Sequence, residues 1–264
     1  MFKRIWIIIV NVIIMLSMLV FVVVYSVSSS RKAMQTQIEH FESTTVTMEH
    51  VTENYLEGEQ RVCDVWTHYI ESENMTIEQA TDFISVSHVL QKACAHIIYP
   101  DTLEGKSTRS NTGVAGVWDV SYKNYNLLND LSWINDKVGE SINISRAYDA
   151  PGIYYSEQSI AFANYVTLNN GGSPKKAILL RLLPESELKS KWYVPNEEYA
   201  GTELAIIEAD GDYIIRDNSY KNSSFFEFYK SYNTTDSTEA EALFKNITSK
   251  TGSFSMLNSK KTTS

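Results

Sequence analysis

Cysteine, histidine and basic side chains are all scarce in this sequence of 264 residues. The two cysteines, Cys63 and Cys94, are too few for a disulfide framework. Two arrangements remain open for them: a single bridge formed in an oxidising compartment, or two buried free thiols. Because basic residues number only 23 against 32 acidic ones, the net charge is -9. Phosphate contacts need a basic face, so the sequence predicts no nucleic-acid partner.

Motifs for catalysis and metal binding are also missing. The sequence contains no G-x-S-x-G, no phosphate-binding loop and no H-E-x-x-H. Three of the five histidines, His40, His50 and His68, fall on one predicted helix at spacings that do not bring imidazoles to one metal ion. The run Asp210-Gly-Asp212 lacks the ligand series of a calcium loop and predicts a tight turn. We therefore predict no catalytic residue, no metal site and no cofactor.

The first apolar segment is long and uncharged, from Ile5 to Val27. As a helix its 23 residues extend about 35 Å, which exceeds the roughly 30 Å of a hydrocarbon core. The apolar part of a cleaved signal peptide is shorter and precedes a site of small residues, which is missing here. We predict an uncleaved anchor in the plasma membrane, residues 1–28. Because four residues precede the span and more than 230 follow it, we expect the domain on the outer side.

A long helix is predicted next, over residues 29–72, which contain no proline and one glycine. Apolar and aromatic residues recur at alternating spacings of four and three from Met34 to Tyr69, which is typical of one helix face. Polar residues at Thr45, Thr52 and Glu59 interrupt a strict coiled-coil repeat. Two interpretations remain open: the face packs on its own domain, or it pairs two subunits into a homodimer.

The remaining sequence predicts an α+β fold. Helix signals occur at residues 74–95, 126–140, 225–232 and 238–250, and strand signals at 96–99, 106–109, 117–122, 142–148, 159–168, 175–183 and 252–257. The order helix, strand, glycine turn, strand occurs twice, around Gly105 and around Gly211. This repetition predicts two tandem antiparallel sheet units flanked by helices, at residues 73–195 and 196–264.

Several stretches resemble one family. They are Ile98-Tyr-Pro-Asp-Thr-Leu-Glu-Gly-Lys-Ser107, Ala161-Phe-Ala-Asn-Tyr-Val166, Ala177 to Pro184, Ile206 to Ile215, Tyr220 to Tyr229 and Thr251 to Ser259. In this order, behind an anchor and a long helix, they resemble a double Cache (PAS-like) extracellular sensor domain of bacterial transmembrane receptors. The resemblance implies an input module of a histidine kinase or diguanylate cyclase. The second PAS-like unit is then incomplete, and we expect the output module in a C-terminal part outside this sequence.

The resemblance also implies a small-molecule pocket in the membrane-distal unit, residues 73–195. The Arg-x-Trp-Tyr signature of amino-acid-binding members does not occur here, so amino-acid recognition is not implied. By position, Arg146 would pair a ligand carboxylate, Asp149 would hold an amine, and tyrosines would wall the ligand. The candidate ligand-binding residues are Trp118, Tyr122, Tyr125, Arg146, Tyr148, Asp149 and Tyr154. Two alternatives stay open: a tyrosine-rich surface strand with an Arg–Asp pair, and a structural or adhesive surface protein without a small ligand.

Overall fold

The computed structural model describes residues 2–86, 94–152, 158–192, 205–208, 210–216, 222, 224–232 and 237–249, except for the side chains of residues 2–14, 192, 232, 237, 239, 248 and 249. The chain forms two compact units, Met1–Glu49 and His50–Ser264. The pocket residue Tyr154, the strand predicted at 252–257 and residues 87–93 of the helix predicted at 74–95 lie outside this description. The last two residues of that predicted helix, 94 and 95, belong to a strand instead.

The first unit is helical throughout. It belongs to α1, Phe2–Ser72, so the predicted long helix is confirmed and begins near the N-terminus. Apolar side chains from Met15 to Val27 are exposed, and Phe21 stacks on Tyr25 with ring centroids 6.3 Å apart. Among the residues that the structure describes, no helix meets the length and apolarity that crossing a membrane requires.

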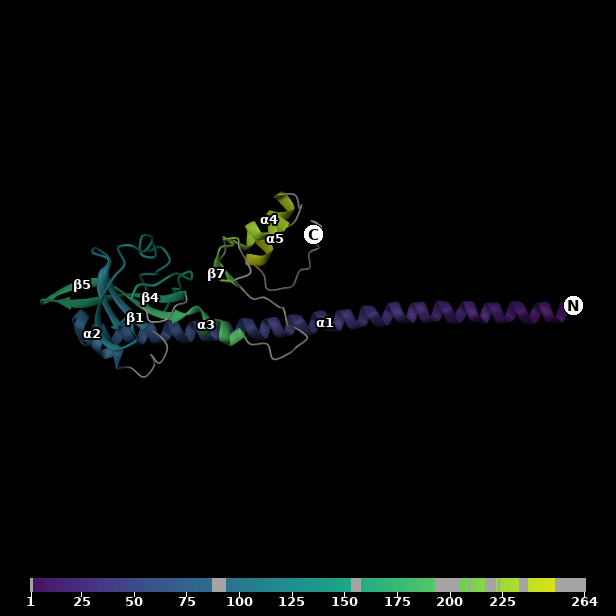
Figure 1. The fold of residues 1–264 in the computed structure, drawn as a ribbon, viewed down its shortest axis with the longest axis horizontal. Coiled ribbons are helices and arrows are strands. Elements are labelled where there is room, and N and C mark those ends of the chain that lie inside the picture. The colour runs from purple at the N-terminus through teal and green to yellow at the C-terminus, as the bar shows by residue number, and fades with distance from the viewer. Residues whose placement is uncertain are drawn as a thin grey trace. The chain divides into compact units, whose positions relative to one another are not determined.

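The second unit is organised around one antiparallel sheet of five strands in the order β3-β2-β1-β5-β4 (Figure 1). The strands are β1 Cys94–Tyr99, β2 Glu104–Arg109, β3 Ala115–Ser121, β4 Ser159–Asn170 and β5 Ser173–Pro184. The β4–β5 hairpin is the longest pairing, and it turns at Gly171 and Gly172, whose φ angles of 63° and 89° suit glycine. Five predicted strands therefore correspond to observed ones.

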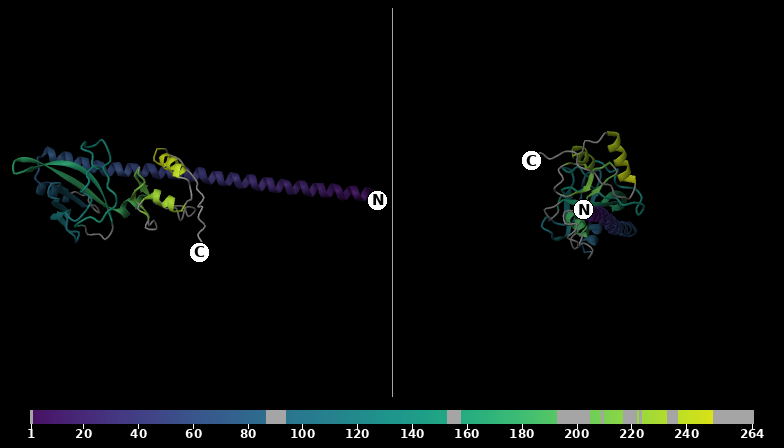
Figure 2. Two further views of the ribbon diagram at one scale, coloured as in Figure 1. Left: turned by 90° about the horizontal axis from the view of Figure 1, so that it is seen from above. Right: turned by 90° about the vertical axis from the view of Figure 1, so that its right-hand side faces the viewer.

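One face of the sheet packs against helices. The end of α1 runs along the β4–β5 hairpin, and α2, Ile77–Ser85, lies beside it (Figures 1 and 2). Thr76 begins α2 with a capping box shared with Gln79. Apolar side chains of both helices, such as Trp66, Ile70 and Ile84, share one core cluster with the sheet. The interpretation in which the long helix packs on its own domain is thus confirmed for this stretch.

An irregular segment, residues 122–152, which we call the roof, covers the other face of the sheet, although its Ile144 and Ala147 pack against the cluster on the α1 face. A helix was predicted at 126–140 and is wrong. Side-chain oxygens in the roof instead accept backbone N–H groups two residues ahead, Asp130 from Ser132 at 2.9 Å and Asn135 from Lys137 at 3.0 Å. Such local bonds compete with helical bonds. The strand predicted at 142–148 is reduced to isolated bridges, Ile144 with Phe162 and Tyr148 with Ser159.

After β5 the chain forms α3, Glu185–Lys189, and the short η2, Ser190–Trp192. A small hairpin follows, β6 Ile206–Ile207 with β7 Tyr213–Ile215, and then α4, Phe225–Tyr232, and α5, Ser237–Ser249. Ile214 and Ile215 join the same core cluster as α1. The mixed helix and antiparallel-sheet class is confirmed, whereas the arrangement as two tandem PAS-like units, the second of them incomplete, stays a prediction.

Both cysteines are free and buried, which is the second of the two arrangements that the sequence left open. They belong to different core clusters, Cys63 to the one on the α1 face and Cys94 to the one beneath the roof. Burial raises the pKa of both thiols, which keeps them protonated and unreactive near neutral pH.

Candidate functional site

The roof encloses a chain of polar aromatic groups. Nδ1 of His96, on β1, lies 2.9 Å from the Tyr122 hydroxyl, and that hydroxyl lies 3.1 Å from the Tyr148 hydroxyl. Tyr122 and Tyr148 are 26 residues apart at the two ends of the roof, so the roof brings these two predicted residues together on the sheet. Tyr125 adds a third ring, with its centroid 5.8 Å from that of Tyr122.

His96 is the buried centre of this chain. Its side chain is 0% exposed, and burial lowers its pKa to about 3, so the imidazole is neutral at physiological pH. A neutral imidazole has one donor and one acceptor nitrogen. Nδ1 is used by Tyr122, whereas Nε2 is buried with no hydrogen-bond partner among the described residues. A buried polar atom without a hydrogen bond costs about 1–3 kcal/mol of folding free energy, so such atoms are rare in folded proteins.

The surroundings of His96 are apolar and small. Ala161 and Ala163 of β4 and Ala150 of the roof are members of the cluster, beside larger apolar residues of β5. Trp133, a roof residue packed against this cluster, also has a buried ring N–H without a partner among the described residues. The roof cluster therefore combines aromatic surfaces with two unused ring nitrogens.

The other predicted ligand residues lie apart from this chain. Trp118 is on β3, partly exposed, and its Nε1 donates to the Val114 carbonyl at 3.1 Å. Asp149 is exposed at the end of the roof. Tyr154 lies outside the described residues.

Arg146 contacts the β6–β7 hairpin. Its guanidinium lies 2.5 Å from Glu208, 3.2 Å from Asp210 and 2.5 Å from Asp212. The hydrogen bond to Glu208 and the nearby negative charges raise its pKa further above the usual range. The backbone N–H of Ala147 also donates to the carbonyl of Ile214 at 3.1 Å. Arg146 thus fastens the roof to this hairpin, and the sequence could not show that partner.

A buried amide network joins the roof to α1. The Asn143 N–H donates to Oε1 of Gln60 at 3.0 Å, and Nε2 of Gln60 donates to Oδ1 of Asn164 on β4 at 3.0 Å. Asn143 also donates through Nδ2 to the carbonyl of Ala163 at 3.0 Å. Asn164 completes the network by donating to Oδ1 of Asp64 at 2.7 Å. One network therefore connects the long helix, the sheet edge and the roof.

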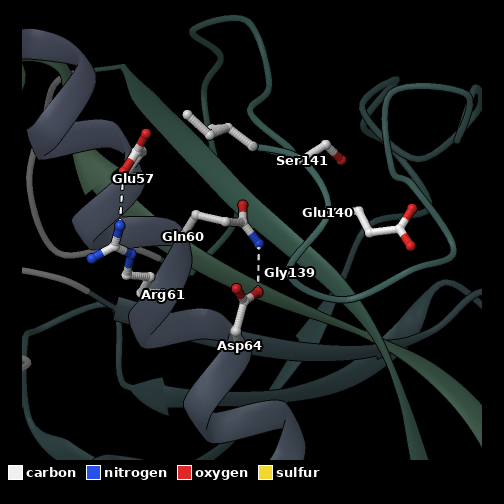
Figure 3. Close-up of a pocket in the computed structure, with 8 residues that line it drawn as sticks. Glu57, Gln60, Arg61, Asp64, Gly139, Glu140 and Ser141 are labelled. Carbon is white, nitrogen blue, oxygen red and sulfur yellow. Dashed lines mark hydrogen bonds and ion pairs between the residues drawn. The ribbon is translucent and has the colours of Figure 1, made fainter.

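The network reaches solvent in a pocket of about 280 Å³ between α1 and the loop 139–142 (Figure 3). Each carboxylate of this pocket already has a partner: Glu57 pairs with Arg61 at 2.9 Å, Asp64 accepts from Gln60 at 3.0 Å, and Glu140 accepts from Lys137 at 3.1 Å. Figure 3 shows the first two of these pairs on α1. The pocket is lined by Glu57, Gln60, Arg61, Asp64, Gly139, Glu140, Ser141 and Ile142. We regard it as the solvent edge of the network.

Sequence reasoning missed His96, Gln60, Asn143 and Asn164. His96, Asn143 and Asn164 each left a weak signal, because each is a polar residue with apolar or aromatic neighbours, such as Cys-Ala-His-Ile-Ile-Tyr in β1. Gln60 left none, because charged residues flank it. Only the fold shows that the partners of all four come from residues 20 to 104 positions away.

The sequence matches no known protein-family model and no curated protein. The solved structures that match include two chemoreceptor ligand-binding domains and a domain of a sensory protein. The ligand-binding domain of the Pseudomonas aeruginosa amino-acid chemoreceptor PctB, solved with L-Arg, has a TM-score of 0.50 and 13% identity over 74% of this chain and 77% of that chain. A domain of a sensory box/GGDEF family protein from Vibrio parahaemolyticus has a TM-score of 0.47 and 11% identity over 74% and 76%. The ligand-binding domain of PctC from Pseudomonas aeruginosa, solved with GABA, has 0.45 and 11% over 73% and 82%.

The similarity to PctB concerns the fold alone, since identity is low. It confirms at that level the resemblance inferred from the sequence: this chain has a fold similar to that of the PctB ligand-binding domain.

Proposed function

We propose that this chain is the ligand-sensing input module of a bacterial transmembrane signalling receptor, of the histidine kinase or diguanylate cyclase type. It binds a small molecule beneath the roof, on the sheet face opposite α1. The observation that carries this proposal is the difference between the two faces. The α1 face is closed by regular helices and apolar packing, whereas the roof face is covered by irregular chain over buried ring nitrogens that have no partner among the described residues.

The proposed ligand contacts are the ring nitrogen of His96 and the rings of Tyr122, Tyr125 and Tyr148. Irregular segments that lie on a rigid sheet often carry binding residues, because they move more readily than the sheet. Trp118, Arg146 and Asp149 lie outside this cluster, and their alanine variants test their predicted roles in the same titrations.

The anchor and the signalling path are further parts of this proposal. The uncharged run from Ile5 to Val27 holds the chain in the plasma membrane, with the sensor domain outside. Met34, Ile38 and Phe41 of α1 are 64%, 45% and 40% exposed, at helical spacings that suit pairing with a second copy. A ligand beneath the roof would shift α1 through the Gln60–Asn143 contact, as a small sliding or rotation of the helix.

The test is a screen of the full chain, purified in a non-ionic detergent, against pooled amino acids, carboxylates, amines and nucleobases. A ligand at 100 times its Kd stabilises the folded state by about 2.7 kcal/mol, which a thermal unfolding scan resolves. Hydrogen exchange then locates the site. We expect slower exchange at the roof amides of Ser145 and Tyr148, which already pair with β4.

Two results oppose the proposal. Slower exchange confined to other parts of the chain overturns the location, and a screen without any binder favours the surface-protein alternative.

A further inference from the structure

The buried nitrogen of His96 restricts the chemistry of a ligand beneath the roof. Nε2 is the free end of the chain His96–Tyr122–Tyr148. When Nδ1 carries the proton and donates to the Tyr122 hydroxyl, Nε2 is an acceptor. When the Tyr122 hydroxyl donates to Nδ1, Nε2 carries the proton and is a donor. The chain therefore suits a ligand that presents a donor or an acceptor of its own.

Charge beneath the roof is the second restriction. Among the described residues, the buried charged side chain is Arg181, which points at Glu59 of α1 on the opposite face. Arg146 is held by three carboxylates of the β6–β7 hairpin. Arg109, half-buried at the end of β2, donates through Nη1 to the Gly113 carbonyl at 3.1 Å. A carboxylate buried beside His96 would have to compete with the Gly113 carbonyl for Arg109, and a buried charge left without a partner costs several kcal/mol.

The composition of the cluster is the third restriction. It brings together the aromatic rings of Tyr122, Tyr125 and Tyr148 and the small side chains of Ala161 and Ala163. Flat ligands gain most from such walls, because offset or edge-on ring contacts add about 0.5–1.5 kcal/mol each beyond the burial of area. The orphaned indole N–H of Trp133 offers a further donor to a heteroatom of such a ring.

From these three restrictions we propose that the ligand is an uncharged planar heterocycle of the nucleobase class, which exchanges a hydrogen bond with Nε2 of His96. This inference rests on the proposed function, since it names the ligand of the same site. It sets this chain apart from the amino-acid chemoreceptors whose fold it shares, because a free amino acid carries a carboxylate.

The experiment uses probe pairs that differ in one group. Uracil is compared with orotate, which adds a carboxylate, and nicotinamide with nicotinate, in which a carboxylate replaces the amide. Each is titrated calorimetrically into the full chain in detergent. We expect the neutral member of a pair to bind at least about tenfold more tightly, because one uncompensated charge costs more than 1.4 kcal/mol.

Variants separate the role of His96 from that of the nearby cation. His96→Phe should weaken the neutral probe about tenfold, the loss of one hydrogen bond, and His96→Gln, which keeps a donor and an acceptor, should restore most of the affinity. Arg109→Gln should leave the affinity unchanged within about twofold, since no charge is recognised. Unfolding temperatures of all three variants show that they are folded, and the glutamine variant keeps the test decisive should the phenylalanine variant unfold.

Each outcome decides a different claim. Tighter binding of the carboxylate members, lost in Arg109→Gln, overturns the ligand class and leaves the sensing function standing. Binding of the neutral members that ignores both His96 variants overturns the contact with Nε2. If neither these probes nor the pooled panel bind, the sensing function falls as well. A tightest binder in the panel that is uncharged, planar and dependent on His96 supports the inference.

Discussion

The buried ion pair between Glu59 of α1 and Arg181 of β5 holds α1 on the sheet, and substitution of either residue tests its contribution to stability. Both Nε and Nη2 of Arg181 lie 2.5 Å from Oε2 of Glu59, and the two side chains are 3% and 15% exposed. The Arg181 guanidinium also lies 5.2 Å from the Trp66 ring. Glu59→Leu leaves the buried guanidinium without its counter-charge. Breaking a buried pair in this way costs about 3–5 kcal/mol.

For a domain of this size we expect the unfolding temperature of Glu59→Leu to fall by about 6–20 °C, at about 2–4 °C per kcal/mol. The double variant Glu59→Leu/Arg181→Met removes both charges, so it should recover at least about 2 kcal/mol of that loss. Arg146→Gln is the matched control, because its side chain is 46% exposed. An exposed pair contributes about 0–1 kcal/mol, and added salt should reduce that contribution further.

Urea denaturation at two salt concentrations measures all four proteins. Two results contradict the reasoning: equal losses in Glu59→Leu and Arg146→Gln, or a double variant that is no more stable than Glu59→Leu. Either would mean that the buried pair is not what fixes α1 at this point.

Three further predictions follow from single contacts. Asn143→Ala removes the partner of the buried Ala163 carbonyl and should cost about 1–3 kcal/mol in urea denaturation, whereas the exposed Asn129→Ala should change stability by less than about 0.5 kcal/mol. Gly211→Ala should destabilise the β6–β7 hairpin by about 1–3 kcal/mol, because φ is 92° and the new Cβ would lie 2.3 Å from Cδ2 of Phe226. Faster hydrogen exchange in residues 210–216 would show this loss. Unchanged exchange would contradict the turn geometry. His96 has a folded-state pKa lowered to about 3, so the unfolded chain binds the proton more readily between that value and about 6.5. The contribution of the neutral imidazole to the free energy of unfolding is present above pH 6.5 and is lost as the pH falls, at up to about 1.4 kcal/mol per pH unit. His96→Phe should therefore make the free energy of unfolding depend less steeply on pH between pH 6 and pH 4. Identical slopes would refute the buried neutral imidazole.

Local signals account for what the sequence predicted well. The capping residues before α2, the Asn-Asn-Gly-Gly turn between β4 and β5 and the apolar periodicity of α1 are each decided by neighbours in sequence. The roof shows where this reasoning fails. A helix is predicted at 126–140, yet the side chains of Asp130 and Asn135 accept hydrogen bonds from backbone N–H groups two residues ahead instead.

The candidate site was predictable only in part, for a similar reason. Tyr122 and Tyr148 were recognised as ring-bearing residues of one region, and the fold brings their hydroxyls together. The sequence does not indicate His96, because its place in the site depends on its contact with Tyr122. It also predicts a ligand contact for Arg146, because the three carboxylates that bind this side chain lie 62 to 66 residues further along the chain. Pairings of such long range are set by topology and leave no mark in the local pattern.

The central claim is that a small molecule binds beneath the roof and contacts His96. The most direct measurement is a calorimetric titration of the tightest binder from the screen into the full chain and into its His96→Phe and Arg146→Gln variants. The account predicts that affinity falls about tenfold in His96→Phe, the equivalent of one hydrogen bond, and stays within about twofold in Arg146→Gln. Unchanged affinity in His96→Phe together with a large loss in Arg146→Gln would contradict it, because the ligand would then lie at the β6–β7 hairpin.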